Sequence, residues 1–383
     1  MNVELVKNTK QGFIQKYYSE PLLVFSPGRI NIIGDHTDYN NGYVLPAAIE
    51  KGIVSAISKS KNHFSSITAL DANEQLEFSL DNIQPIKNGR WKNYALGVIA
   101  EIQKTGKSIK NFNLAFSGNL PIGAGLSSSA ALENSIAFVL NELFQLKFSK
   151  KEMVFISQQA EHNFVGVKCG IMDQYIGMFG ENKSALLLDC KSMEATLYKI
   201  DLSPYKIILI NTNVKHSLAK SSYNDRRKAC ERVAKILKRE SLRDGNEDDL
   251  KILKDKIFDA DYQKALFVFQ ENKRVLEAAK CIKDNDIESL GVLLYASHSG
   301  LRHQYKVSCE ELDFLVELAK QNPNVIGSRM MGGGFGGCTI NIVKSSIIDE
   351  FTENIQNLYN SKFGNNCSIY NVSLSQGTHL ITI

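Results

Sequence analysis

The chain has 383 residues, of which 43% are hydrophobic and 22% are charged. That balance is typical of a folded globular protein and excludes wholesale disorder, and the length predicts two or three domains. Lys and Arg together number 45 and Asp and Glu number 41, so the formal net charge is only +4. Such a small excess does not indicate a nucleic-acid or membrane partner.

The cysteines and the N-terminal segment indicate a cytoplasmic protein. Seven cysteines are scattered singly and no CxxC pair occurs, which excludes a zinc ribbon or a thioredoxin-type motif. Unpaired cysteines are typical of a reducing compartment. The opening segment MNVELVKNTKQGF lacks the apolar core of a secretory signal, and no apolar run approaches the length of a membrane span.

Strand-like and helix-like segments alternate in the first half of the chain. Short apolar runs predict strands at Leu22–Phe25, Ile30–Ile33, Gly52–Ile57 and Leu114–Phe116. Apolar residues at helical spacing predict a helix over Ser127–Phe144. Ser149 and Glu152 form a capping box, which opens a helix expected to reach about Asn163 and to stop at Gly166.

The second half continues the mixture without a strict βαβ rhythm. We expect a buried strand, a serine-capped helix, a polar loop, a glycine-rich turn before a strand, and two final strands around Gly377. In the same order, the residues are Lys206–Asn211 for the buried strand, Ser221 or Ser222 to about Glu240 for the helix, Asp244–Asp249 for the polar loop, Gly327–Gly337 before the strand Thr339–Val343, and Ser368–Ile383 for the final strands. The mixture predicts an α+β protein. The basic segment Arg226–Arg243 is interpreted as a solvated helix face because acidic residues follow it and no aromatic residues are interleaved.

The segment Pro121–Ala131, PIGAGLSSSAA, has the features of an anion-binding turn. Two glycines allow close backbone approach to a ligand, and three serines lead into a helix whose first amides lack internal partners. The segment is not a Walker A loop, because GxxxxGK[ST] is absent. A plain glycine turn before a serine-capped helix explains the same residues equally well.

Three other segments carry candidate chemistry. Phe25–Pro46 packs Arg29 and the run Asp-His-Thr-Asp between strands, which suits a polyhydroxylated ligand, a metal or only a solvated turn. Asp173 falls in the first turn of a predicted helix, where it could accept a hydroxyl proton or be a simple helix charge. Five of the six positions 332–337 are glycine, which indicates either a tight turn or direct ligand contact.

Taken together, these segments resemble the galactokinases of the GHMP kinase superfamily. The similar segments are GRINIIGDHTDYNNGYVLP, PIGAGLSSSAALENS, EHNFVGVKCGIMDQ, HSLAKSSYNDRR and GSRMMGGGFGGCTINIV. The resemblance implies a two-domain α+β kinase with mixed β-sheets and its active site in the cleft between domains. It implies an N-terminal domain of residues 1–203 plus 370–383 and a C-terminal domain of residues 204–369. The implied reaction is phosphorylation of α-D-galactose at its C1 hydroxyl by ATP.

The resemblance also implies roles for particular residues. Asp173 and Arg29 would be catalytic. The sugar would be bound by Asp35, His36, Thr37, Asp38, Gly170 and Tyr223. The ATP phosphates would be bound by Gly123, Ala124, Gly125, Leu126, Ser127, Ser128 and Ser129. Ser129 and Glu161 would be the ligands of Mg²⁺. We expect a monomer with a small sugar as its only partner, and neither nucleic acid nor membrane.

One residue departs from the family pattern, and three other readings remain. The first acid of the sugar signature is usually Glu, whereas this chain has Asp35, which is shorter by one methylene. A related sugar 1-kinase acting on N-acetylgalactosamine or arabinose is the nearest alternative. A non-catalytic galactose sensor is disfavoured by the intact run from Ser127 to Ala131. A mevalonate- or homoserine-type kinase would have no use for the Asp-His-Thr-Asp segment.

Overall fold

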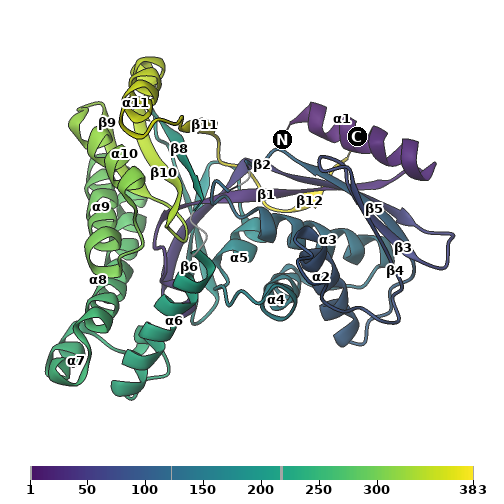
Figure 1. The fold of residues 1–383 in the computed structure, drawn as a ribbon, viewed down its shortest axis with the longest axis horizontal. Coiled ribbons are helices and arrows are strands. Elements are labelled where there is room, and N and C mark those ends of the chain that lie inside the picture. Colours follow the sequence, from purple (N-terminus) through teal and green to yellow (C-terminus); the bar gives the residue numbers. More distant parts are fainter. Residues whose placement is uncertain (1, 122, 216–218, 383) are drawn as a thin grey trace.

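The computed structural model describes residues 2–121, 123–215 and 219–382, and the side chains of residues 215 and 219–223 lie outside that description. The chain forms two halves, each built on its own β-sheet (Figure 1). The N-terminal half contains an eight-stranded sheet with helices α1–α5. The C-terminal half contains a four-stranded sheet with helices α6–α11. The predicted α+β class is confirmed.

The eight-stranded sheet has the order β12-β1-β2-β5-β3-β4, and β6 and β7 extend from β2. All its pairs are antiparallel except β3 with β5. The strands are β1 (Leu22–Ile33), β2 (Tyr43–Lys59), β3 (Ser65–Ala69), β4 (Glu74–Phe78), β5 (Phe112–Gly118), β6 (Ser184–Asp189), β7 (Glu194–Lys199) and β12 (His379–Leu380).

Helices cover both faces of this sheet, because its strands alternate apolar side chains between the faces. Helix α1 (Val3–Tyr17) lies on one face, where Phe13 packs against Phe25 and Val54 of the sheet. The other face carries a larger apolar core and the remaining helices of this half (Figure 1). They are α2 (Trp91–Lys104), α3 (Ser128–Phe144), α4 (Lys150–Ala160) and α5 (Met172–Phe179).

The four-stranded sheet is antiparallel, in the order β11-β8-β10-β9. Its strands are β8 (Tyr205–Lys215), β9 (Val325–Met330), β10 (Gly336–Lys344) and β11 (Ser368–Val372). Ile207 and Leu209 of β8 enter the core shared with the N-terminal half, whereas Ile208 and Ile210 enter a second core under α10 and α11. The helices are α6 (Ala219–Ile236), α7 (Glu247–Ile252), α8 (Asp259–Lys283), α9 (Ile287–Gly300), α10 (Glu310–Gln321) and α11 (Ile348–Phe363).

Short irregular helices join these elements. π-Helical turns, η2 (Glu161–Val165) and η5 (Leu301–Tyr305), continue α4 and α9. The 3₁₀ turns are η1 (Asp38–Asn40), η3 (Leu242–Asp244), η4 (Lys254–Lys256) and η6 (Ser345–Ile347). The capping box at Ser149 and Glu152 is confirmed, and Gly166 ends the helical run with a φ of 77°.

Several predicted boundaries differ from the structure. The two strands expected at 22–25 and 30–33 are one continuous strand, β1, whose register shifts after Pro27, because Pro has no N–H to donate. Helix α6 ends at Ile236, before the predicted Glu240. The predicted polar loop at 244–249 contains the start of α7, which Asn246 caps. Residues 327–330 of the expected glycine-rich turn are strand, because β9 pairs with β10.

The last segment forms two strands, as expected, but they join different sheets. β11 pairs with β8 in the C-terminal half, and β12 pairs with β1 in the N-terminal half. The domain boundary predicted at residue 370 falls inside β11. The chain returns to the N-terminal half only after Val372, through a bridge between Leu374 and Ile49. The predicted domain partition stays a prediction.

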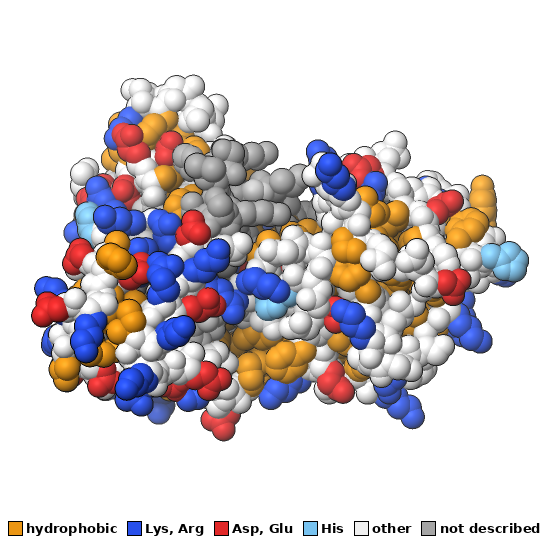
Figure 2. Space-filling view, turned by 60° about the horizontal axis from the view of Figure 1, so that its bottom comes forward, with side chains coloured by type: hydrophobic (Ala, Val, Ile, Leu, Met, Phe, Trp, Pro, Cys, Tyr) orange, Lys and Arg blue, Asp and Glu red, His pale blue; other side chains and the backbone are white. Residues whose placement is uncertain are grey.

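Basic residues of α6 pair with acidic side chains of α6 and α8. Arg227 pairs with Glu231, and Arg232 pairs with Asp261 at 2.8 Å. Figure 2 shows Lys and Arg side chains interspersed with Asp and Glu on the side of the molecule formed by the C-terminal half. The distribution fits the interpretation as a solvated face. Among the helices that the structure describes, none has both the length and the apolar character that crossing a bilayer requires.

Candidate active site

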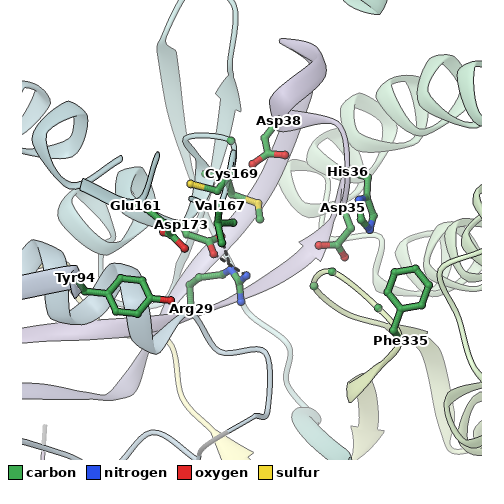
Figure 3. A pocket seen from close by; sticks show the side chains of 15 residues that line it. Arg29, Asp35, His36, Asp38, Tyr94, Glu161, Val167, Cys169, Asp173 and Phe335 are labelled. Carbon is green, nitrogen blue, oxygen red and sulfur yellow. Dashed lines mark hydrogen bonds and ion pairs between the residues drawn. The ribbon is translucent and has the colours of Figure 1, made fainter. Parts of the chain in front are cut away.

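A cavity of about 320 Å³ opens where the two halves meet (Figure 3). The N-terminal half contributes β1, the loop after it, α2, and the segment from η2 to the start of α5. The C-terminal half contributes the turn between β9 and β10. The lining includes seven of the predicted site residues, namely Arg29, Asp35, His36, Asp38, Glu161, Gly170 and Asp173. Segments far apart in the sequence thus meet in one cavity, which several charged side chains line.

Arg29 and Asp173 form a bidentate ion pair in this cavity. Arg29 Nε donates to Asp173 Oδ1 at 2.8 Å, and Nη2 donates to Oδ2 at 3.0 Å. The pair is tied to the predicted phosphate loop, because Arg29 Nη1 donates to the carbonyl of Gly125 and the Ser127 hydroxyl donates to Asp173 Oδ2. The two predicted catalytic residues therefore connect the cavity to the loop that precedes α3.

The loop before α3 has the backbone geometry of an anion-binding turn. Gly123 and Gly125 have φ values of 77° and 70°, which glycine adopts without strain. Ser127 precedes the helix, but its hydroxyl bonds to Asp173, and no side chain of the described residues caps α3. The first amides of α3 therefore keep donors for a ligand, at the positive end of the helix dipole. Ser128 is exposed and Ser129 is partly exposed beside these amides.

The loop between β1 and β2 presents its acids and histidine to the cavity. His36 has a φ of 66°, and its Nδ1 lies 2.8 Å from the hydroxyl of Tyr39. Burial, with a smaller contribution from Arg226, lowers the pKa of His36 to about 3, so the ring is neutral at physiological pH. Burial and the nearby Asp173 raise the pKa of Asp38 to about 6.

Gly170 and Thr37, two more of the residues predicted to bind the sugar, shape the structure around Asp38 and its loop. A Cβ at Gly170 would lie 1.9 Å from Asp38 Oδ2, so only glycine fits beside that carboxylate. Thr37 is fully buried and does not line the cavity. Its hydroxyl lies 2.7 Å from the carbonyl oxygen of Gly34 and 2.6 Å from that of Tyr43, and its single proton can be donated to either, which ties the two ends of the loop together. The side chain of Tyr223 lies outside the described part of the chain.

Asp35 has a partner that the sequence did not indicate. Arg329 of β9 is fully buried, and its Nη2 donates to Asp35 Oδ2. The other carboxylate oxygen of Asp35 accepts from Asn31 Nδ2 at 3.0 Å. Arg329 Nη1 also donates to the carbonyls of Asn31 and Ile32, at 3.1 and 3.0 Å. The C-terminal half therefore holds the shortened acid of the sugar segment by a buried ion pair.

The oxygens near Glu161 fit a hard divalent cation. Gln174 Nε2 donates to Glu161 Oε2 at 3.0 Å and to Glu133 Oε2 at 3.3 Å, so two buried carboxyl groups lie side by side. Burial, followed by the charge of Glu161, raises the pKa of Glu133 well above its ordinary value. A cation would relieve this crowding of carboxyl groups. No cluster of three or more His, Cys, Asp or Glu that could hold a metal occurs in the described residues. Mg²⁺ commonly binds through one or two carboxylates plus substrate phosphates, so no such cluster is required.

Other cavity residues were not named from the sequence. Tyr94, Cys169 and Phe335 line the cavity beside the predicted residues. The glycines 332–334 line it as well, and they form a tight turn with positive φ at Gly332 and Gly334. Direct contact of this turn with a ligand stays a prediction. Of these additional residues, only the glycines were indicated by the sequence, through their run. Nothing in the sequence distinguishes Tyr94 or Glu133 from ordinary core positions.

Comparisons with known proteins agree with this geometry. The model described as GHMP kinases N terminal domain matches residues 93–181, and that described as GHMP kinases C terminal matches residues 278–360. A crystal structure of mevalonate kinase, 19% identical, superposes with a TM-score of 0.64, covering 93% of this chain and 99% of that one. At that identity the likeness shows the fold. These findings give the chain the two-domain fold of a GHMP-type kinase.

Closer relatives narrow the class. The model described as Galactokinase galactose-binding signature matches residues 11–59. Galactokinase of Clostridium acetobutylicum is 40% identical, covering 99% of each chain, and that of Thermosipho africanus is 41% identical over 92% of this chain and 98% of its own. The crystal structure of Lactococcus lactis galactokinase complexed with galactose is 32% identical, with a TM-score of 0.94, covering 98% of this chain and 99% of that one. The chain belongs to the galactokinase family and is an ATP-dependent sugar kinase.

The buried pair of Asp35 and Arg329 predicts strong energetic coupling. Arg329→Met should lower the free energy of unfolding by about 3–5 kcal/mol, because it leaves a buried carboxylate without its counter-charge. Adding Asp35→Asn should recover a large part of that loss, since the amide carries no charge. Urea unfolding of the two single variants and the double variant measures the coupling. If the losses in the free energy of unfolding of the two single variants simply add in the double variant, Asp35 and Arg329 are not energetically coupled and the prediction is wrong.

Proposed function

We propose that this protein transfers the γ-phosphoryl group of ATP to the C1 hydroxyl of α-D-galactose. The observation that supports this most strongly is the position of Asp173, which bonds to Ser127 of the phosphate loop and to Arg29 within the cavity. That cavity also contains Asp35, His36 and Asp38. An acceptor hydroxyl bound there would lie between a carboxylate and an arginine, next to the site for a triphosphate.

The arrangement suits phosphoryl transfer, in which positioning and charge stabilisation matter more than covalent chemistry. Asp173 can accept the proton of the sugar hydroxyl, or orient that hydroxyl while it holds Arg29 in place. Arg29 can stabilise charge on the transferring group or on the attacking oxygen. The uncapped amides of α3 and the loop residues from Gly123 to Ser129 would bind the ATP phosphates.

Mg²⁺ is part of this proposal. Ser129 and Glu161 would hold it, with the phosphates as further ligands, and it would neutralise charge between the β- and γ-phosphates. The oxygen donors beside Glu161 support the choice of a hard cation. We also propose a cytoplasmic location and a monomer; all seven cysteines are free, which supports a reducing compartment.

Sugar preference is tested by Mg·ATP consumption with galactose, 2-deoxygalactose, N-acetylgalactosamine, arabinose, glucose and talose. We expect galactose to give the highest kcat/KM, with the product phosphorylated at C1. Asp35 makes this panel informative, because its side chain is one methylene shorter than the Glu usual in the family and its carboxylate is paired with Arg329. Preference for another sugar would refute the assignment to galactose, and galactose binding without turnover would favour a sensor.

The role of Asp173 is tested by Asp173→Ala. Turnover should fall by about a thousandfold or more, because the variant loses both the proton acceptor and the partner of Arg29. Binding of ATP, measured by calorimetry, should weaken by about threefold or less, since the phosphate-binding amides of α3 remain. Asp173→Asn is the matched control, because it keeps the size and one acceptor oxygen of the side chain. Normal turnover in Asp173→Ala would overturn the catalytic assignment.

Asp38 predicts a pH dependence. Its pKa of about 6 in the free protein means that the carboxylate becomes protonated as the pH falls through that value. The ionised form accepts sugar hydroxyls at both oxygens and more strongly than the neutral acid, so kcat/KM for galactose should fall about tenfold per pH unit below pH 6. His36, with a pKa of about 3, does not contribute to this break. The profile of kcat/KM for ATP at saturating galactose serves as the comparison and should lack the break. A flat galactose profile between pH 5 and 7 would contradict the prediction.

A further inference from the structure

The loop that carries Asp35, His36 and Asp38 is held at both ends by consecutive side chains of α8. At its start, the amide of Gly34 donates to Glu271 Oε1 at 3.0 Å. At its end, the amide of Tyr43 donates to Asn272 Oδ1 at 2.7 Å. Neither α8 residue lines the cavity. A helix of the C-terminal half therefore fixes where a loop of the N-terminal half begins and ends.

The fit between α8 and the loop is close at the backbone level. A Cβ at Gly34 would lie 2.8 Å from Val275 Cγ2, and a Cβ at Gly42 would lie 2.4 Å from Asn272 Oδ1. Gly34 has a φ of 98°, so the loop leaves β1 in a conformation that other residues avoid. The amide of Gly34 is buried at this sharp turn, and Glu271 supplies its acceptor.

The carboxylate of Glu271, which accepts the hydrogen bond from the loop, is held in place by other residues. Its side chain is fully buried, and its Oε1 also accepts from the hydroxyl of Ser297 on α9 at 2.6 Å. Its other oxygen accepts from Arg274 Nε at 2.7 Å, which balances the buried charge. Hydrogen bonds to a charged acceptor are stronger than those between neutral groups. The position of the Glu271 carboxylate is therefore fixed by contacts with α8 and α9, independently of its contact with the loop.

We propose that Glu271 and Asn272 are positioning residues for sugar recognition, which hold the loop of residues 34–43 so that its acids and histidine face the sugar. The inference rests on the proposed function, in which this loop binds galactose. Its consequence is specific: loss of a loop contact should weaken the interaction with the sugar and leave the interaction with ATP unchanged. The phosphate loop is anchored separately, through Arg29 and Asp173.

Asn272 gives the sharpest test, because one atom of a partly exposed side chain makes the contact. Asn272→Ala should raise KM for galactose roughly five- to tenfold, the range expected for one lost hydrogen bond, with KM for ATP and kcat within about twofold. Asn272→Asp keeps an acceptor oxygen in the same place and should restore KM for galactose to within about threefold of wild type. Lys273→Ala, which removes the exposed contact of the next residue with Glu247, is the matched control and should change none of these values.

The wild-type reaction and the thermal midpoint of each variant are measured first. Absence of galactose phosphorylation by the wild type would refute the proposed function and this inference with it. Turnover by the wild type, with an unchanged KM for galactose in Asn272→Ala, would refute this inference alone. Equal increases in KM for galactose and ATP, without rescue by Asn272→Asp, would show a purely structural contact and would also overturn it.

Discussion

The bidentate pair between Arg29 and Asp173 is the interaction on which the arrangement of the site depends. Arg29 lies on β1, a strand of the eight-stranded sheet, and Asp173 lies in the first turn of α5. Their pairing fixes the orientation of α5 against the sheet, and the additional bonds to Gly125 and Ser127 fix the loop that opens α3. Three elements distant in the sequence are thus aligned around a single pair of charges (Figure 3).

Other buried charges lie where the two halves meet. Arg329 reaches from β9 to Asp35, and Glu271 reaches from α8 to the start of the same loop. Removing such groups from water is costly, and the cost is offset only when every charge has a partner of good geometry. Replacing these groups by apolar residues could give a tighter junction, but it would not specify how the loop faces the cavity. Polar contacts define one relative placement of the two halves more narrowly than apolar packing does.

Much of this organisation could be predicted from local sequence, and the remainder depends on long-range pairing. The stripe of apolar residues in α3 and the capping box at Ser149 predict their helices, because both signals lie within one element. The resemblance of the chemical segments to galactokinases also predicts seven of the residues that line the cavity. The partner of Asp35 could not be predicted, because Arg329 reaches it only through the register of β9 and β10. Glu133 likewise sits among the buried residues of an apolar helix, where only the tertiary structure reveals the neighbouring carboxyl group.

The final strand has a consequence for how the protein is made. β12 pairs with β1, Thr378 donates to the carbonyl of Gly177 in α5, and its hydroxyl lies 3.0 Å from that of Ser26. While the chain is still being synthesised, β1 therefore lacks its partner strand β12 until residues near 380 have been added. During translation, the strand that carries Arg29 and the helix that carries Asp173 are both present long before Thr378, which contacts both of them. Completion of the N-terminal half thus follows synthesis of the C-terminal half, which reverses the usual order in which domains finish folding as a chain emerges.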